Sequence, residues 1–298
     1  MTRKTQVSGI RKPMSEEAKA RIAEAVRASA ARKRLEAGIT APHEVRRSKP
    51  LELVKMKNQE FNDDLFVPMA TGKMVDRLFT ANGGVPKATN YMVVGDPGVG
   101  KSTVTLDILS DLEAKGHKVL FISAEMTRID LHGYVKRYPK FGNVDIIFLG
   151  EYLDDDPKAV IEEVLKPGYD VVLIDSFAEA QDAIKESNHM TSTGSEKFLI
   201  DTMIRHNLGE NDGNINTAFL VIQQVTKNGI FVGSNRLKHN VTGMLEIRFD
   251  PDLDAPYLMF SKNRRGETNK KLYYSLKQNG DVSYFEMNYE DGEGDFED

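Results

Sequence analysis

The chain has 298 residues, 40% of them hydrophobic, and a formal net charge of -5, which is enough for one large α/β domain with tails. It contains no cysteine, which excludes disulfides, cysteine-ligated zinc and a thiol nucleophile, and its six histidines lack paired metal spacing. Its apolar runs are far shorter than the roughly 20 residues of a membrane helix, and residues 1–12 lack an apolar signal segment, so we expect a soluble, cytoplasmic protein without membrane contact.

The first 50 residues form a basic arm. They hold 13 Lys/Arg against 5 Asp/Glu, a net of +8, so the rest carries 27 against 40, a net of -13. Ser15 starts a predicted helix that runs to about Leu35 and ends before Gly38. We expect residues 1–50 to be partly helical or disordered. A basic arm on an acidic body favours an anionic polymer such as nucleic acid, and the alternative is a solvated tail.

From about residue 65 short apolar runs alternate with helical stretches, which predicts a mostly parallel sheet with crossover helices. Asn279-Gly280 is a hairpin signal between the last two runs, so antiparallel strands are expected at one edge. The predicted strands lie at Tyr91–Val94, Lys118–Ser123, Val144–Leu149, Asp170–Asp175, Thr217–Ile222, Met244–Arg248, Tyr257–Ser261, Leu272–Leu276 and Val282–Phe285. We therefore assign residues 51–287 to one domain.

Residues 288–298 form the end of the chain and contain six acids and no base. We expect this acidic tail to be disordered. Its carboxylates repel DNA, whereas Tyr289 and Phe296 among them suit a basic groove on a replication or recombination protein.

A phosphate-binding motif follows the first predicted strand. Residues 95–102 match GxxxxGK[ST] completely, with a strand before them and a helical run after them. In such a loop the backbone N–H groups surround phosphate, Lys101 reaches the terminal phosphates and Ser102 ligates magnesium. The predicted ATP-binding residues are Gly95, Asp96, Pro97, Gly98, Val99, Gly100, Lys101, Ser102 and Thr103.

Two acids follow other predicted strands and complete a hydrolytic site. Asp175 ends the run at residues 170–175 and is the expected partner of Ser102 in holding Mg²⁺. The next residue is Ser176, so a general base must come from elsewhere. Glu125 ends the run at residues 118–123 and is placed to polarise the attacking water, with capping of the next helix as the alternative role.

These motifs resemble the RecA-like P-loop ATPases, and within them the RadA (Sms) branch-migration proteins and the DnaB-type helicases, over about residues 65–287. The resemblance implies that Glu125 activates water. It also implies that Gln223 or Gln224 senses the γ-phosphate. Ser261-Lys-Asn-Arg-Arg-Gly266 is similar to the Lys-Asn-Arg-Phe-Gly signature of RadA proteins, with Arg265 in place of phenylalanine.

The chain also departs from these larger proteins. RadA carries a four-cysteine zinc ribbon and a Lon-like domain that are not matched here, and the arm is too small for the helical domain of DnaB helicases. The expected form is a core-only, phage-type recombination ATPase.

Lys262 and Arg264 are expected to act on a neighbouring subunit. In RecA-like rings and filaments, cations at this place in the chain reach the γ-phosphate held by the next protomer, so a homo-oligomer is implied. Residues two apart in a strand project to the same side, and Arg265 would point the opposite way. The alternative is that these cations contact DNA or solvent.

Two polar segments, 183–195 and 225–240, are the expected DNA-facing loops. The second holds the candidate contacts with phosphates and bases, while His239 is expected to be structural. These candidates are Lys227, Phe231, Arg236 and Lys238. An ordinary solvated loop is the alternative.

The favoured function is a DNA-dependent ATPase that acts on single-stranded DNA in recombination, annealing, branch migration or repair. A replicative DnaB-like helicase is the neighbouring alternative, and a RecA-like signalling ATPase that binds proteins is the alternative of another class. A catalytically inactive scaffold is disfavoured, because Lys101, Ser102, Glu125 and Asp175 are all present.

Overall fold

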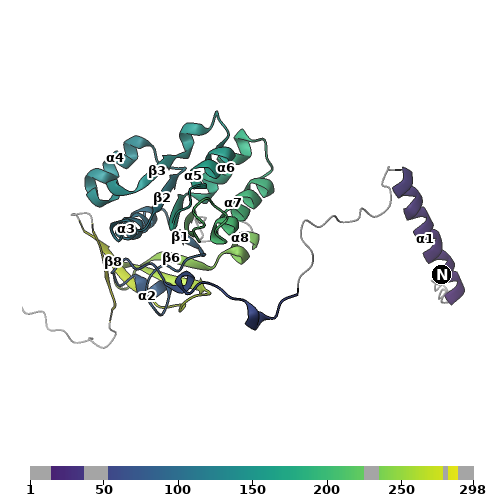
Figure 1. Ribbon diagram of the computed structural model, residues 1–298, viewed down its shortest axis with the longest axis horizontal. Coiled ribbons are helices and arrows are strands. Elements are labelled where there is room, and N and C mark those ends of the chain that lie inside the picture. The colour runs from purple at the N-terminus through teal and green to yellow at the C-terminus, as the bar shows by residue number, and fades with distance from the viewer. Residues whose placement is uncertain (1–14, 37–52, 225–234, 278–280, 288–298) are drawn as a thin grey trace, which may run out of the picture. The chain divides into compact units, whose positions relative to one another are not determined.

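The computed structural model describes residues 15–36, 53–224, 235–277 and 281–287 (Figure 1). The chain separates into two compact units, residues 1–59 and 60–298. This boundary lies after residue 59, whereas the sequence places the end of the arm at residue 50. No helix among the described residues has the length and apolar character needed to cross a membrane.

The first unit contains helix α1 (Glu16–Glu36) and the 3-10 turn η1 (Met56–Asn58). Ser15 starts α1, because its hydroxyl accepts a hydrogen bond from the Ala18 amide at 3.3 Å. The described side chains of α1 are exposed or partly exposed. The helix therefore has no buried face within its own unit.

The second unit is built on a nine-stranded sheet in the order β3-β2-β4-β5-β1-β6-β7-β8-β9. The first six strands in this order are parallel, and β6 to β9 pair antiparallel. The strands are β1 (Asn90–Gly95), β2 (Val119–Ser123), β3 (Asp145–Phe148), β4 (Val171–Asp175), β5 (Ala218–Gln224), β6 (Gly243–Asp250), β7 (Ala255–Asn263), β8 (Leu272–Leu276) and β9 (Val282–Phe285). Each predicted strand is present, and residues 278–280 of the expected hairpin turn lie outside the described residues.

Helices cover both faces of this sheet, as expected for parallel strands that are buried on both sides (Figure 1). One hydrophobic core lies under α2, α3, α4 and η3, and the other lies under α5 to α8. The helices and turns are η2 (Asp63–Phe66), α2 (Asp76–Phe79), α3 (Lys101–Ala114), α4 (Arg128–Arg137), η3 (Pro139–Asn143), η4 (Leu149–Tyr152), α5 (Pro157–Leu165), α6 (Phe177–Ser187), α7 (Ser192–Asn207) and α8 (Asn235–Asn240).

The prediction of a loop at residues 183–195 is wrong, because most of this segment is helical. Helix α6 extends to Ser187 and α7 begins at Ser192. Phe177, Ala180 and Ile184 form the buried stripe of α6, and the polar residues between them occupy its outer face. The polar composition that resembles a loop is therefore the solvent-facing side of a helix.

A cluster of charges fixes α3 to the C-terminal strands. Asp107 on α3 is fully buried and binds Lys73 at 2.9 Å and also Lys140. The same two lysines bind Asp281, next to β9, at 2.9 and 3.2 Å. Because a buried carboxylate is costly without partners, this cluster holds the helix and the hairpin together as one structure.

Candidate active site

The predicted phosphate loop follows β1 and leads directly into α3. Gly98 and Gly100 have φ angles of 80° and 98°, in the left-handed region that glycine adopts without strain. Gly100 is also the N-cap of α3, so the free amides of the first helical turn face the loop. The local structure therefore supplies the backbone donors and the helix N-terminus that bind phosphate.

Lys101 lies within this loop. Its ammonium group donates to the carbonyl oxygens of Gly95 and Asp96, both at 3.0 Å. Burial lowers the pKa of Lys101, while the carboxylates of Asp175, Glu125 and Asp96 act in the opposite direction. The side chain is thus held among acids and carbonyls, and an anionic phosphate is the complementary ligand.

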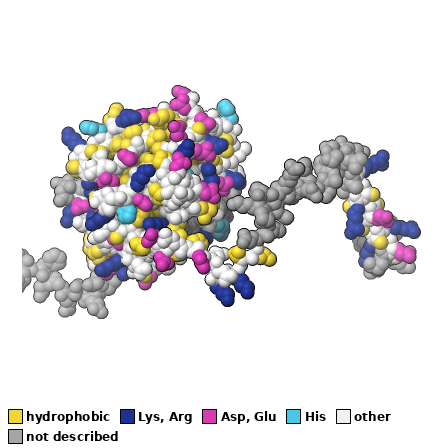
Figure 2. All heavy atoms as spheres, viewed as in Figure 1, with side chains coloured by type: hydrophobic (Ala, Val, Ile, Leu, Met, Phe, Trp, Pro, Cys, Tyr) yellow, Lys and Arg dark blue, Asp and Glu magenta, His cyan; other side chains and the backbone are white. Residues whose placement is uncertain are grey.

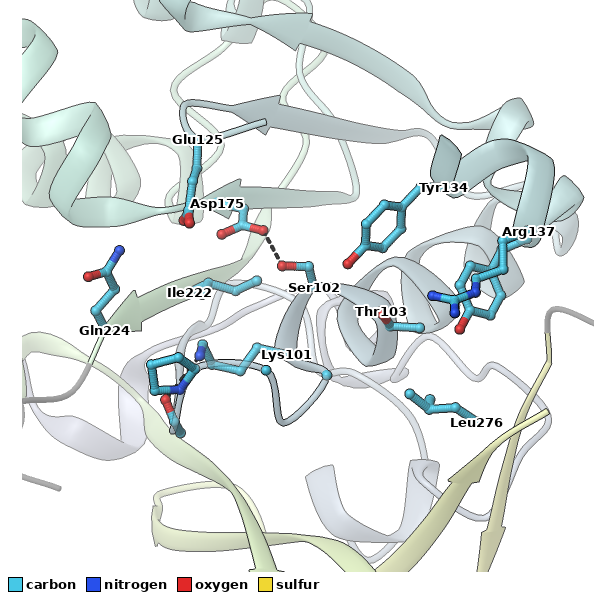
Figure 3. Close-up of a pocket in the computed structure, with 15 residues that line it drawn as sticks. Lys101, Ser102, Thr103, Glu125, Tyr134, Arg137, Asp175, Ile222, Gln224 and Leu276 are labelled. Carbon is cyan, nitrogen blue, oxygen red and sulfur yellow. Dashed lines mark hydrogen bonds between the residues drawn. The ribbon is translucent and has the colours of Figure 1, made fainter. Parts of the chain in front are cut away.

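Asp175, at the end of β4, and Ser102, in the first turn of α3, meet across the site. The Ser102 hydroxyl donates to Oδ2 of Asp175 at 2.5 Å (Figure 3). Asp175 is only 2% exposed. Burial raises the pKa of Asp175 to about 6, the nearby Glu125 charge adds to this rise, and the Ser102 hydrogen bond and Lys101 oppose it.

These two oxygen ligands fit a magnesium ion. Mg²⁺ prefers oxygen donors and is commonly held by one or two protein groups together with phosphate oxygens. A cation would also compensate the buried Asp175 carboxylate, which burial disfavours. Among the described residues no group of three or more His, Cys, Asp and Glu side chains could hold a metal by itself, so phosphate would complete the ligand set.

Glu125 is held at the same edge by backbone hydrogen bonds. The amides of Ala124 and Glu125 donate to the carbonyl oxygen of Asp175, at 2.7 and 3.2 Å. Its carboxylate lies beside that of Asp175, and the residue is exposed to solvent (Figure 3). Thr127, with its capping box, is the N-cap of α4, so Glu125 does not cap that helix.

All these groups line one pocket of about 390 Å³ at the carboxyl ends of β1, β2, β4 and β5. Ligands of open parallel sheets bind at this edge. Of the predicted ATP-binding residues, Gly95, Pro97, Gly98, Gly100, Lys101, Ser102 and Thr103 line the pocket. Asp96 contributes its carbonyl oxygen to Lys101, and Val99 packs against the core.

The two candidate glutamines point to opposite faces of β5. Gln224 lines the pocket, whereas Gln223 is 2% exposed and alternates with Phe219 and Val221 of the other core. Strand β5 lies between β1 and β4, so Gln224 at its end lies between the phosphate loop and Asp175. Of the two, Gln224 has the position needed to contact a terminal phosphate.

No family model matches the sequence. The chain is 27% identical over 201 residues to the DNA repair protein RadA of Campylobacter jejuni, which is 67% of this chain and 43% of the relative. It is 28% identical over 230 residues to RadA of Chlamydia trachomatis, covering 76% and 47%, and 29% identical over 203 residues to RadA of Listeria monocytogenes, covering 66% and 41%. The chain thus spans less than half the length of these relatives.

A solved structure shows the same fold. The KaiC-like protein of the archaeon Pyrococcus horikoshii superposes with a TM-score of 0.55 at 17% identity, over 74% of this chain and all of that chain. The chain has a RecA-like fold with a P-loop, and its sequence is similar to those of the RadA proteins. Its sheet is mostly parallel with antiparallel C-terminal strands, as the resemblance implies.

The C-terminal strands of the RecA-like core support the phosphate loop, which the sequence does not indicate. Tyr274 of β8 is buried and donates its hydroxyl hydrogen to the Val99 carbonyl oxygen. Leu276 of the same strand lines the pocket, and both side chains lie 3.5 Å from the space a Gly100 Cβ would occupy. The sequence shows a hairpin here but not the surface against which it packs.

Helix α4 and the residue after it supply three pocket residues that the sequence did not indicate. Tyr134 and Arg137 line the pocket beyond the phosphate loop (Figure 3), and Tyr138 is also part of the lining. The Arg137 guanidinium lies 5.8 Å from the centre of the Tyr138 ring. The i, i+3 and i+4 spacing that places them on one helix face was the available signal.

Lys262 and Arg264 lie away from the pocket of their own RecA-like core. Lys262 donates to the carbonyl oxygens of Lys238 and Val241, at 2.6 and 2.8 Å, and Arg264 donates to that of His239 at 2.9 Å. Burial and the neighbouring Arg264 lower the pKa of Lys262. Both cations therefore bind the C-terminal end of α8, where free carbonyls favour positive charge.

Most of the candidate DNA contacts lie outside the described residues. Lys227 and Phe231 lie outside the described residues, and so does the Arg236 side chain. Lys238 is partly exposed on α8, a helix that occupies the end of the segment expected to be a loop. The DNA-binding assignment of these four residues stays a prediction.

Replacing Asp175 with asparagine is expected to stabilise the ligand-free protein at neutral pH. The folded-state pKa of Asp175 lies above 3.8, so the folded chain binds this proton more tightly than the unfolded chain. Its ionisation therefore lowers the free energy of unfolding as pH rises from about 4 to about 6. A shift of about two pKa units corresponds to about 3 kcal/mol, which is an upper limit for the gain in Asp175→Asn.

Urea denaturation of the wild type and Asp175→Asn at pH 4.5 and pH 7.5 tests this expectation. The difference between the two proteins should grow with pH, because their other carboxyl groups are the same. Asp182→Asn, which changes an exposed carboxylate on α6, is the matched control and should leave stability unchanged. A variant less stable than the wild type at pH 7.5 would contradict the expectation.

Proposed function

We propose that the protein is a DNA-dependent ATPase that acts on single-stranded DNA in recombination, annealing, branch migration or repair. The convergence of Lys101, the Ser102–Asp175 pair and Glu125 in one pocket carries the proposal. A pocket with phosphate donors, a metal-compatible oxygen pair and a separate carboxylate matches the requirements of phosphoryl transfer to water. The relatives named DNA repair protein RadA support the DNA part of the proposal.

The two sides of the pocket differ in chemistry, which sets the orientation of the proposed ATP. Its phosphates would lie on the loop amides and the α3 N-terminus, with Lys101 beside the β- and γ-phosphates. The opposite side of the pocket holds Tyr134, Arg137 and Leu276, which offer aromatic, cationic and apolar surfaces to a base. The base of the proposed nucleotide thus lies between β8 and α4.

Hydrolysis needs a base and charge stabilisation. The Glu125 carboxylate accepts a proton from the attacking water, and its solvent-exposed position gives water access. Lys101 stabilises the charge that develops on the phosphate oxygens. Ser102 and Asp175 would hold Mg²⁺, which would supply further charge neutralisation. Gln224 would report the presence of the γ-phosphate to β5.

The basic arm is the proposed main source of DNA affinity. Acidic and basic side chains are interspersed on the visible face of the second unit, whereas dark blue Lys and Arg side chains stand out along α1 (Figure 2). The described basic side chains of α1 include Lys19, Arg21, Arg27 and Arg32. Non-specific DNA binding comes chiefly from such phosphate contacts.

Deletion of residues 1–50 is therefore expected to weaken single-stranded DNA binding and to make it less sensitive to salt. Each phosphate neutralised on a single strand contributes about -0.7 to the slope of log K against log salt. Fluorescence anisotropy with labelled oligonucleotides at several salt concentrations measures both quantities. Substitution of Arg21, Arg27 and Arg32 by glutamine keeps the helix and should reproduce part of the loss. If DNA affinity and the salt slope are unchanged, the arm does not bind DNA and a protein-binding role is favoured.

ATP turnover without DNA, with single-stranded DNA and with duplex DNA tests the proposed function. Stimulation by single-stranded DNA is the expected result. Turnover that no DNA alters would favour a signalling ATPase instead. Strand separation ahead of a single-stranded tail would favour a helicase, whereas annealing or branch migration without it supports the proposed role.

A further inference from the structure

A second pocket lies on the face of the core formed by η2 and the loop before β1. It has a volume of about 240 Å³ and combines the apolar side chains of Leu65, Phe66, Pro68 and Pro86 with the cations Lys87 and Arg265. This volume is below the roughly 300–1,000 Å³ typical of small-molecule sites, so it suits a side chain better than a cofactor.

Several apolar side chains around this pocket are exposed. Phe66 is 56% exposed, and Phe61 and Val67 beside it are 60% and 58% exposed. The Phe61 ring meets the Phe66 ring edge-on, with centroids 6.3 Å apart. Adjacent exposed aromatic side chains of this kind mark surfaces that receive another segment or molecule.

The cations of the pocket are available for an acidic ligand. Within the described part of the chain, neither Lys87 nor Arg265 forms an ion pair, and no acidic residue lines the pocket. Arg265 is exposed, and only its backbone amide is engaged, with Asn263 Oδ1 at 2.9 Å. The pocket therefore pairs a positive rim with an apolar floor.

We propose that this pocket binds the chain's own acidic tail, residues 288–298, with an aromatic side chain of the tail seated against Phe66. The tail has six carboxylates, and its aromatic residues are Tyr289 and Phe296, so it is complementary to the pocket in both charge and apolar character. Arg265, where the similar RadA signature has phenylalanine, supplies one of the two cations.

The tail can span a long distance from the end of β9. Strand β9 ends at Phe285, and 11 residues follow Met287. An extended chain spans up to about 3.3–3.6 Å per residue, so these residues cover roughly 36–40 Å, which is comparable with the width of a domain. A tethered segment also has a high effective concentration, up to the millimolar range, which two ion pairs and one aromatic contact can exploit.

A tryptophan reporter tests the proposal. The chain has no tryptophan, so Phe296→Trp introduces a single fluorophore in the tail of the full-length protein. Its emission should be shifted to shorter wavelength, and acrylamide should quench it several-fold less than in a free peptide of residues 288–298 with the same substitution. High salt should reverse both effects, because the rim contacts are ionic.

Charge reversal identifies the site. Arg265→Glu combined with Lys87→Glu should return the tryptophan signal to that of the free peptide, and Phe66→Ala should do so in part. Lys136→Glu combined with Lys166→Glu, which reverses two exposed charges elsewhere on the unit, is the matched control and should change nothing. Circular dichroism melting checks that each variant is folded.

Three results would overturn the proposal. The first is a tryptophan signal of Phe296→Trp that equals that of the free peptide when the pocket is unchanged. The second is a signal that grows with protein concentration, since the tail of another copy would then occupy the pocket. The third is a solvent-exposed tryptophan together with loss of single-stranded DNA binding in Arg265→Glu, which would assign the pocket to nucleic acid.

Discussion

Glu125→Gln is expected to bind ATP normally and to hydrolyse it about a thousandfold more slowly, because general-base catalysis contributes about 10²–10⁴ in rate. Backbone amides of residues 124 and 125 fix the segment to Asp175, so the substitution leaves the position of the side chain intact. Phosphate release measures turnover, and a fluorescent ATP analogue measures binding.

Lys101→Ala is the comparison that separates binding from chemistry. It removes the ammonium group that compensates phosphate charge, so we expect both nucleotide affinity and turnover to be lost. Lys101 donates hydrogen bonds only to carbonyl oxygens of its own loop, so its removal breaks no side-chain hydrogen bond. Lys115→Ala, an exposed lysine at the other end of α3, is the control. Normal hydrolysis by Glu125→Gln would mean that another residue activates water.

Arg264→Ala is expected to assemble, to bind ATP and to lose turnover by about a thousandfold, as is typical when a cationic finger is removed. In the structure Lys262 and Arg264 bind α8 and do not line the pocket of their own chain. A role at the γ-phosphate therefore requires the pocket of a neighbouring subunit. Because both cations now bind the α8 carbonyls, that role also requires them to exchange partners on assembly.

Mixing two inactive variants distinguishes this shared site from a purely structural role. Arg264→Ala supplies an intact phosphate loop and Lys101→Ala supplies an intact finger, so random mixing in a head-to-tail assembly joins the two at about one interface in four. Partial recovery of turnover is the expected result, and Arg264→Lys should retain some activity by itself. If Arg264 only stabilises α8, the mixture stays inactive even though subunits exchange.

Much of this fold follows from the sequence by local patterns. The nine strands are short apolar runs, and β1, β2, β4 and β5 are buried on both faces, which makes their runs easy to recognise. The phosphate loop is equally local, because its glycine spacing and the helix after it are continuous in the chain. Asp175 and Glu125 could be placed near it because carboxyl ends of parallel strands share one edge.

Only the tertiary structure decided the remaining features, because they depend on which strands are neighbours and which elements pack together. The order of strands places β5 between β1 and β4 and brings Gln224 rather than Gln223 into the pocket. Packing of the C-terminal hairpin places Tyr274 against the phosphate loop. Lys262 and Arg264, whose sequence suggests a phosphate ligand, bind carbonyl oxygens of α8 in the single chain. A side chain's partners come from residues distant in sequence, which periodicity and spacing do not encode.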